Sequence, residues 1–309
     1  MISTDTLLEA FRKMLTIRIA ETMIADDFKA NKIFSFYHSS AGQEATAVGT
    51  CAALKPQDRV FGNHRSHGHY LAKGGNLYRM LCEIYGKADG CCKGYGGSMH
   101  MLDRSVGFMG STPILGSAVP IACGSAFEQK VNKHNAVTVV FTGDGATEEG
   151  AFYESLNLAA TLKLPIIFVV EDNLYAVNTP RSARRANSFS LAKVVTGLGC
   201  NYFDENGNVF SAMHVSTGVA RMSAMMGQPA VVHATVFRHM AHSGPITDES
   251  VRIIDTKEVR AETDPIKLIM SELSSRGVSE DTMSRIQADV TVSVFNAFTQ
   301  AKQAPEPEP

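Results

Sequence analysis

The chain has 309 residues, 44% of them hydrophobic, and a formal net charge of −2. This near-neutral charge argues against binding to nucleic acid or to an anionic membrane, and no apolar run approaches the roughly 18 residues that span a bilayer. Six cysteines without a C-x-x-C pair indicate reduced thiols. Because the N-terminal sequence lacks a signal-peptide pattern, we expect a cytoplasmic protein.

The N-terminal third combines two predicted helices with a polar cluster between them. Ser3 or Thr4 is expected to cap an amphipathic helix whose apolar residues run from Leu7 to Ile19, and residues 77–85 predict a second helix. Between them lie three histidines and an arginine, namely His64, Arg65, His67 and His69. Imidazole and guanidinium groups suit an anion such as a diphosphate, whereas the spacing is not that of the familiar zinc motifs. A solvated turn is the alternative interpretation.

The next segment is rich in glycine. Residues 86–101 predict a long irregular loop that backbone or a ligand approaches closely, and its adjacent Cys91 and Cys92 are interpreted as packing residues. A loop over residues 108–117 then precedes a helix of small residues over 119–127.

Residues 137–175 predict a βαβ unit, since two apolar runs flank an alanine-rich helix that starts near Ala146. The first strand ends at Gly143-Asp144-Gly145 and the second precedes Asn173 and Tyr175. Parallel strands end at the same sheet edge, where carboxylate and amide oxygens suit Mg²⁺ and glycines allow a phosphate to approach. The Gly-Asp-Gly triplet alone is more often a plain turn, but the asparagine at the second strand end favours a metal–diphosphate site.

The C-terminal half predicts a basic loop, further strands and a helical end. Arg181, Arg184 and Arg185 lie in a loop over residues 177–190, which is either solvated or in contact with a partner chain. Strands over 198–204 and 229–237 flank a helix over 209–226, and the second strand leads to Arg238 and His242. Residues 256–301 are expected to be helical, with a disordered tail at 303–309. Without an internal repeat, we expect one domain over residues 1–302.

Two of these segments resemble one family. GDGATEEGAFYESLNLAATLKLPIIFVVEDNLYAVNT and GCCKGYGGSMHM are similar to motifs in the alpha subunits of thiamine diphosphate-dependent decarboxylase (dehydrogenase) components of 2-oxo acid dehydrogenase complexes. The pyruvate and acetoin dehydrogenase alpha subunits are the most similar in motif, and the resemblance extends over roughly residues 5–300. It implies an α/β fold of the thiamine diphosphate-binding, transketolase-like type, with a central parallel sheet and helices on both faces.

The resemblance also implies roles for individual residues. By position, His67 and His242 would be catalytic, and Asp144, Asn173 and Tyr175 would hold Mg²⁺. The residues that would bind the cofactor are His64, Arg65, Pro113, Leu115, Gly143, Asp144, Gly145, Ala146, Asn173, Tyr175, Arg238 and His242. The chain departs from the family pattern at Asp172, where the family usually has asparagine, at Pro113 and Ala241, where it usually has glycine, and at residues 246–248.

The function implied is decarboxylation of a pyruvate-like 2-oxo acid, or cleavage of acetoin, with acyl transfer to lipoamide. In this family a glutamate of a separate beta subunit activates the cofactor, so the resemblance implies an α2β2 assembly, and a lipoyl acyltransferase is a further possible partner. One alternative is a thiamine-dependent carboligase or acyl transferase outside a dehydrogenase complex. The others are a non-catalytic subunit that retains the fold and, more remotely, a magnesium-dependent phosphohydrolase.

Overall fold

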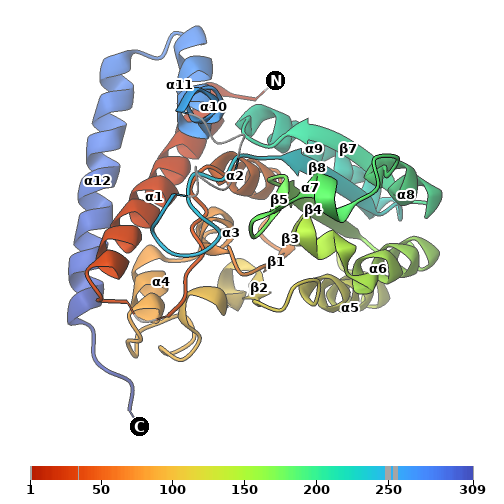
Figure 1. The fold of residues 1–309 in the computed structure, drawn as a ribbon, viewed down its shortest axis with the longest axis horizontal. Helices are drawn as coiled ribbons and strands as arrows, with labels where there is room; N and C mark the ends of the chain where they lie inside the picture. The colour runs from red at the N-terminus through yellow and green to blue at the C-terminus, as the bar shows by residue number, and fades with distance from the viewer. Residues whose placement is uncertain (1, 34, 248–251, 253–256, 309) are drawn as a thin grey trace.

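A parallel β-sheet forms the centre of the fold (Figure 1). The computed structural model describes residues 2–33, 35–247, 252 and 257–308. Within these ranges the sheet has six strands in the order β2-β1-β3-β4-β8-β7, and every pairing in it is parallel. The strands are β1 (Arg59–Gly62), β2 (Phe108–Ser111), β3 (Thr138–Gly143), β4 (Ile166–Asp172), β7 (Asn201–Asn206) and β8 (Ala230–Thr235).

Strands β3 and β4 are buried on both faces, which explains why they are continuous apolar runs in the sequence. Alternate residues point to opposite sides: Val139 and Phe141 join one hydrophobic core, whereas Val140 joins the other. Burying each such side chain contributes about 1.5–3 kcal/mol. The predicted βαβ unit is confirmed.

Helices cover both faces of the sheet. One layer contains α5 (Ala118–Val131), α6 (Gly150–Thr161) and α8 (Leu191–Gly197). The other contains α2 (Glu44–Ala52), α3 (His67–Lys73), α4 (Leu77–Ile84) and α9 (Phe210–Met225). The predicted α/β class, with helices on both faces, is therefore confirmed.

Long terminal helices pack side by side at one end of the molecule (Figure 1). Helix α1 (Thr4–Lys29) is capped by Ser3, whose hydroxyl accepts the Thr6 N–H at 3.1 Å, as expected. The C-terminal helices are α10 (Lys257–Thr263), α11 (Pro265–Ser275) and α12 (Glu280–Gln303), and α12 runs along α1. No helix in the described ranges combines the length and the apolar character needed to cross a bilayer.

The residues after α12 differ from the disordered tail that we expected. The Pro305 carbonyl accepts the Ala88 N–H at 2.9 Å, and the Glu308 carbonyl accepts the Tyr95 hydroxyl at 2.8 Å. Glu306 also forms an ion pair with Lys87. These partners lie in the glycine-rich loop, far away in sequence, so composition alone could not indicate them.

The glycine-rich loop folds around a buried carboxylate at the end of α4. The two Glu83 oxygens accept four backbone N–H groups at 2.6 to 3.1 Å, those of Cys92, Gly94, Gly96 and Gly97. The glycine density therefore reflects an approach of backbone to a carboxylate within the chain, which we did not predict. Two short 3-10 helices, η1 (Gly97–Met99) and η2 (Arg104–Val106), complete this region.

Candidate active site

The carboxyl ends of β3 and β4 bring Asp144 and Asn173 to one edge of the sheet. Gly143 of β3 is opposite Glu171 of β4 in the parallel register, and the Asp144 N–H donates to the Glu171 carbonyl at 3.2 Å. A parallel sheet binds ligands outside such strand ends. After β4 the chain makes a short hairpin of β5 (Tyr175–Ala176) and β6 (Thr179–Pro180), followed by α7 (Arg181–Arg184).

A cleft with about 520 Å³ of open space lies at this edge. It brings together most of the cofactor-binding residues predicted above, which come from five separate parts of the chain. They are His64, Arg65, Leu115, Gly143, Asp144, Gly145, Ala146, Asn173, Tyr175, Arg238 and His242. The cleft also contains Gln43, Asn63, Glu171, Ala176 and Val177, for which we predicted no role.

Gly143 and Gly145, on either side of Asp144, are glycines for different structural reasons. A Cβ built on Gly143 meets nothing within 4 Å, so this backbone faces open space that a ligand group can enter. A Cβ on Gly145 would lie 2.8 Å from the Ala176 Cβ, so Gly145 is required by packing within the chain. The α-helix that we expected near Ala146 begins at Gly150, after a 3-10 turn, η3 (Gly145–Glu148).

Asp144 is almost completely buried and is engaged by the basic loop. Burial and the neighbouring Asp172 raise the pKa of Asp144, and an ion pair with Arg184 opposes this shift. Arg184 also pairs with Glu148. Arg185 donates to the Asp144 carbonyl at 2.7 Å and to the Thr147 hydroxyl at 2.6 Å.

The expectation of a solvated basic loop is therefore wrong for Arg184 and Arg185, whose side chains are only 8% and 9% exposed. Arg181, at the start of the same helical turn, pairs with Asp172. The Asp172 carboxylate also accepts the Leu174 N–H at 2.8 Å and contacts His233 at 3.0 Å, which explains an acid where the resembled family has an amide.

The opposite wall of the cleft is cationic. Arg65 is 5% exposed, donates only to the carbonyls of Ser39 and His242, and forms no salt bridge within the described residues. Burial, together with the charge of Arg238, lowers the pKa of Arg65 to about 9. A buried guanidinium without a carboxylate partner is costly, and an anionic ligand would offset that cost.

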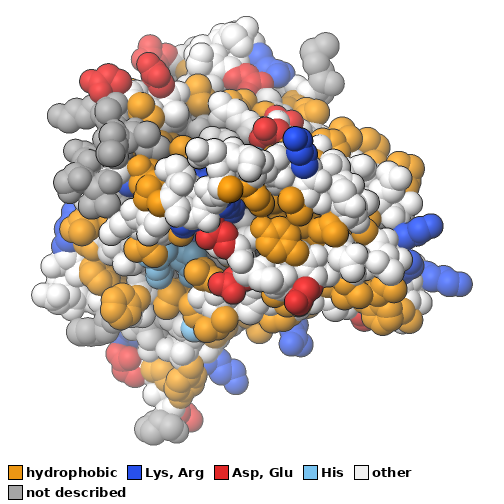
Figure 2. Space-filling model, turned by 45° about the vertical axis from the view of Figure 1, so that its right-hand side comes forward, with side chains coloured by type: hydrophobic (Ala, Val, Ile, Leu, Met, Phe, Trp, Pro, Cys, Tyr) orange, Lys and Arg blue, Asp and Glu red, His pale blue; other side chains and the backbone are white. Residues whose placement is uncertain are grey.

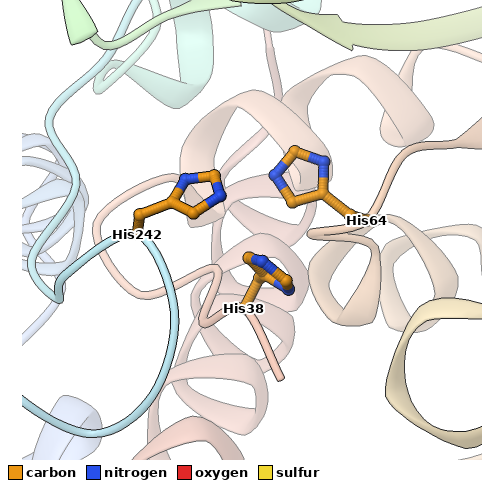
Figure 3. Close-up of side chains that lie close together, drawn as sticks. All are labelled: His38, His64 and His242. Carbon is orange, nitrogen blue, oxygen red and sulfur yellow. The ribbon is translucent and has the colours of Figure 1, made fainter. Parts of the chain in front are cut away.

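Three histidines gather at the mouth of the cleft (Figures 2 and 3). His64 and His242 line it, and His38 lies against both, with ring centres 4.6 and 4.9 Å away. Burial, followed by the charge of Arg65, lowers the pKa of His38 to about 3 and that of His64 to about 2. Both rings are therefore neutral near pH 7.

Two predicted site residues lie elsewhere. His67, which we expected to face the catalytic chamber, is completely buried behind the cleft at the start of α3. Its nitrogens contact the Glu21 carboxylate at 3.1 Å and the Ser98 hydroxyl at 2.8 Å, so it joins α1, α3 and η1. Pro113 lies on the partly exposed loop after β2 and does not line the cleft; Leu115, two residues later, does.

Other cleft residues were not predicted as site residues. Gln43, which lines the cleft, and His38, which lies against His64 and His242, belong to the turn-rich segment before α2. From the sequence, loop and capping roles explained both residues equally well. Glu171 is the last residue but one of the apolar strand β4, and a buried carboxylate in that position was a signal we did not use. Its side chain contacts His69 at 3.2 Å, and the His69 ring stacks on Phe141 at 3.8 Å.

A larger and more open depression of about 1260 Å³ lies beside this cleft, beneath residues 180–192. Of the predicted site residues it contains only Tyr175. It lacks the strand-end oxygens and the buried Arg65, so the smaller cleft remains the candidate site.

Taken together, the strand-end oxygens, the open backbone at Gly143 and the buried Arg65 define a parallel α/β protein with a polar cleft whose buried guanidinium suits an anionic ligand. Residues 12–309 match the family described as "Dehydrogenase E1 component", and the chain belongs to this family. The family uses a thiamine diphosphate-binding fold, as the motifs indicated, and membership implies thiamine diphosphate as the cofactor.

Curated relatives agree with this assignment. The alpha subunit of acetoin:2,6-dichlorophenolindophenol oxidoreductase from Cupriavidus necator is 38% identical over 307 residues, which cover 99% of this chain and 92% of that protein. The corresponding Bacillus subtilis subunit is 33% identical, covering 96% and 89%. The mitochondrial pyruvate dehydrogenase E1 component subunit alpha-1 of Arabidopsis thaliana is 34% identical, covering 99% and 79%.

Proposed function

We propose that this chain is the alpha subunit of a two-chain, thiamine diphosphate-dependent enzyme that decarboxylates a pyruvate-like 2-oxo acid or cleaves acetoin and passes the acyl unit to lipoamide. The observation that carries the proposal is the cleft, which is lined by Asp144, Asn173 and the buried Arg65. At Gly143 the backbone of this cleft faces open space that a ligand can enter. The relatives named for pyruvate and for acetoin oxidoreduction support the substrate class.

The residues present fit the cofactor. Asp144, Asn173 and Tyr175 would hold Mg²⁺, because it prefers one or two carboxylates with substrate phosphates and water. Arg65, Arg238 and His64 would hold the diphosphate, and Leu115 at the rim would contact its apolar part. When bound, thiamine diphosphate supplies the electron sink for carbanion chemistry.

This chain's residues would then orient the cofactor and keep water away from it. His242 borders the cleft beside Arg65, which holds the His242 carbonyl at 3.0 Å, so it is placed to exchange a proton with a substrate. Among the described residues, Glu171 is the glutamate that lines the cleft, and it is engaged by His69. We therefore propose that the glutamate that activates the cofactor comes from a beta subunit in an α2β2 assembly, and that a lipoyl acyltransferase takes up the acyl unit.

The test is reconstitution with the partner chain. The chain and its beta subunit, purified separately and together, would be assayed with pyruvate and with acetoin, using dichlorophenolindophenol as electron acceptor. We expect activity that depends on thiamine diphosphate and Mg²⁺, and only when both chains are present. Full activity of this chain alone would contradict the two-chain proposal, and no activity with either substrate would contradict the substrate class.

The ion pair between Arg184 and Asp144 leads to a separate prediction. The guanidinium must leave the carboxylate before the carboxylate can coordinate a metal, so removing it should favour metal binding. We expect Arg184→Ala to raise the affinity for thiamine diphosphate in the presence of Mg²⁺ about tenfold, the equivalent of one hydrogen bond to a charged group. Isothermal titration calorimetry measures this.

The matched control for Arg184→Ala is Arg181→Ala. Arg181 belongs to the same helical turn but pairs with Asp172, not with Asp144. The affinity of Arg181→Ala for thiamine diphosphate should stay near the wild-type value. Equal gains in both variants would indicate a general loosening of the loop, and no gain in Arg184→Ala would exclude competition between the guanidinium and the metal.

A further inference from the structure

We propose that His38, His64 and His242 form a binding site for a zinc-class divalent cation, one that favours imidazole ligands and is distinct from the Mg²⁺ ligands proposed above. The three histidines come from separate segments: before α2, between β1 and α3, and after β8. Figure 3 shows their rings arranged around one small space, with nitrogens of His64 and His242 turned toward each other.

The spacing of the rings matches metal coordination. Their centres are 4.6, 4.9 and 5.4 Å apart, and one nitrogen from each lies within 4.8 Å of the others. Zn–N distances of about 2.0–2.1 Å with tetrahedral angles place the centres of ligating imidazole rings about 5 Å apart. The rings are thus already at ligand spacing.

Two of the three histidines, His38 and His64, also have a buried ring nitrogen that lacks a partner. The Nδ1 atoms of His38 and His64 are buried without a hydrogen-bond partner. An unsatisfied buried polar atom is costly. In Figure 3 the His64 nitrogen turned toward His242 is the other one, Nε2, so the ring would have to turn for Nδ1 to meet a cation.

The guanidinium of Arg65 lies close to the site and favours an anion as the fourth ligand of the metal. Arg65 donates to the His242 carbonyl at 3.0 Å, and its charge disfavours a bare dication. An anion such as hydroxide or chloride at the fourth position offsets this repulsion. The expected site therefore has three imidazoles and one exchangeable anion, an open coordination sphere.

A second group of possible ligands, Glu83, Cys91 and Cys92, does not compete as a site. Both Glu83 oxygens already accept two backbone N–H groups each. A metal there would have to break this cradle, whereas the Nδ1 atoms of His38 and His64 have no hydrogen bonds to give up.

Calorimetric titration of Zn²⁺ alone into the metal-free chain tests the site. We expect one equivalent to bind, with at least about tenfold weaker affinity in His38→Gln and in His64→Gln. His134→Gln, at a half-exposed histidine far along the chain after α5, should bind as the wild type does. Absence of binding, binding unchanged in the two cluster variants, or binding lost in Cys92→Ser would overturn the proposal.

X-ray absorption at the zinc edge gives a second test that needs only the wild-type chain. It should show nitrogen or oxygen ligands at about 2.0–2.1 Å with imidazole scattering, and no sulfur at about 2.3 Å. A sulfur shell would overturn the site, even if a histidine variant failed to fold.

His64 and His242 also line the cofactor cleft, so an ion held by them and a ligand in the cleft should exclude each other; this consequence rests on the proposed function. Zn²⁺ given to the two-chain enzyme before thiamine diphosphate and Mg²⁺ should inhibit initial activity more than the same Zn²⁺ given afterwards. Equal inhibition in both orders would contradict the exclusion. If the protein binds zinc but not thiamine diphosphate, the zinc site is supported and the cofactor assignment is overturned. If it binds thiamine diphosphate but not zinc, the cofactor assignment is supported and the zinc site is overturned.

Discussion

Replacing Asp144 by alanine should weaken the metal-dependent binding of thiamine diphosphate on the order of a hundredfold or more. Loss of groups that merely support a metal ligand typically costs 10–100-fold, and Asp144 supplies the only carboxylate among the three proposed Mg²⁺ ligands. Asn173 and the Tyr175 carbonyl are neutral, so they cannot replace its charge. Calorimetry with thiamine diphosphate, with and without Mg²⁺, measures the difference.

Controls for Asp144→Ala separate charge from folding. Asp144→Asn keeps the shape and one oxygen but loses the charge, and it should show most of the same loss. Asp204→Asn removes an exposed carboxylate of β7, outside the cleft, and should bind as the wild type does. Unchanged affinity in Asp144→Ala would refute the metal assignment.

The metal assignment also predicts how the affinity for thiamine diphosphate and Mg²⁺ changes with pH. Burial and Asp172 raise the pKa of Asp144, so its protonated form persists to higher pH than that of an ordinary aspartate. Mg²⁺ requires the carboxylate, so affinity should fall as the pH falls through this raised pKa. The corresponding fall should be absent in Asp144→Asn.

The second large effect is expected at Arg65. Arg65→Met should lower the affinity for thiamine diphosphate by two or more orders of magnitude, because losing one partner of a buried charge interaction costs about 2–5 kcal/mol. The loss should depend on the phosphates. The wild type should bind thiamine diphosphate far more tightly than thiamine, and Arg65→Met should lose most of that preference. Competition binding with both compounds measures it.

Arg65 also holds the Ser39 and His242 carbonyls, so its structural contribution needs a control. Arg59→Met removes a guanidinium from β1 that pairs with Glu128, away from the cleft. Similar thermal unfolding of the two variants without cofactor, with weak binding only in Arg65→Met, would support a diphosphate contact. A preference for the diphosphate that survives in Arg65→Met would rule the contact out.

Much of the fold could be predicted from local pattern. Strands β3 and β4 are buried on both faces, so they had to be continuous apolar runs, and the alanine-rich segment between them had to be a crossover helix. The place of Asp144 beside Asn173 followed from the same pattern, because parallel strands end at one edge. Resemblance to the family added Arg65, Leu115 and His242, which lie in separate loops.

Contacts between side chains of distant loops could not be predicted. Arg184 and Asp144 are 40 positions apart, and nothing in either segment indicates that a loop arginine reaches a strand-end carboxylate. His67 shares a short motif with Arg65, yet it begins a helix and points toward Glu21 of α1. A difference of two residues at the start of a helix changes which face a side chain lies on.

The sequence by itself determined the parallel sheet, the strand edge that carries Asp144 and Asn173, and the family, because these depend on apolar periodicity and on motifs that are contiguous in the chain. Only the tertiary structure decided that Arg184 covers Asp144, that Glu83 organises the glycine-rich loop, and that His38, His64 and His242 meet. The physical reason is that these contacts depend on the paths of loops, and the path of a loop depends on what the rest of the fold places beside it.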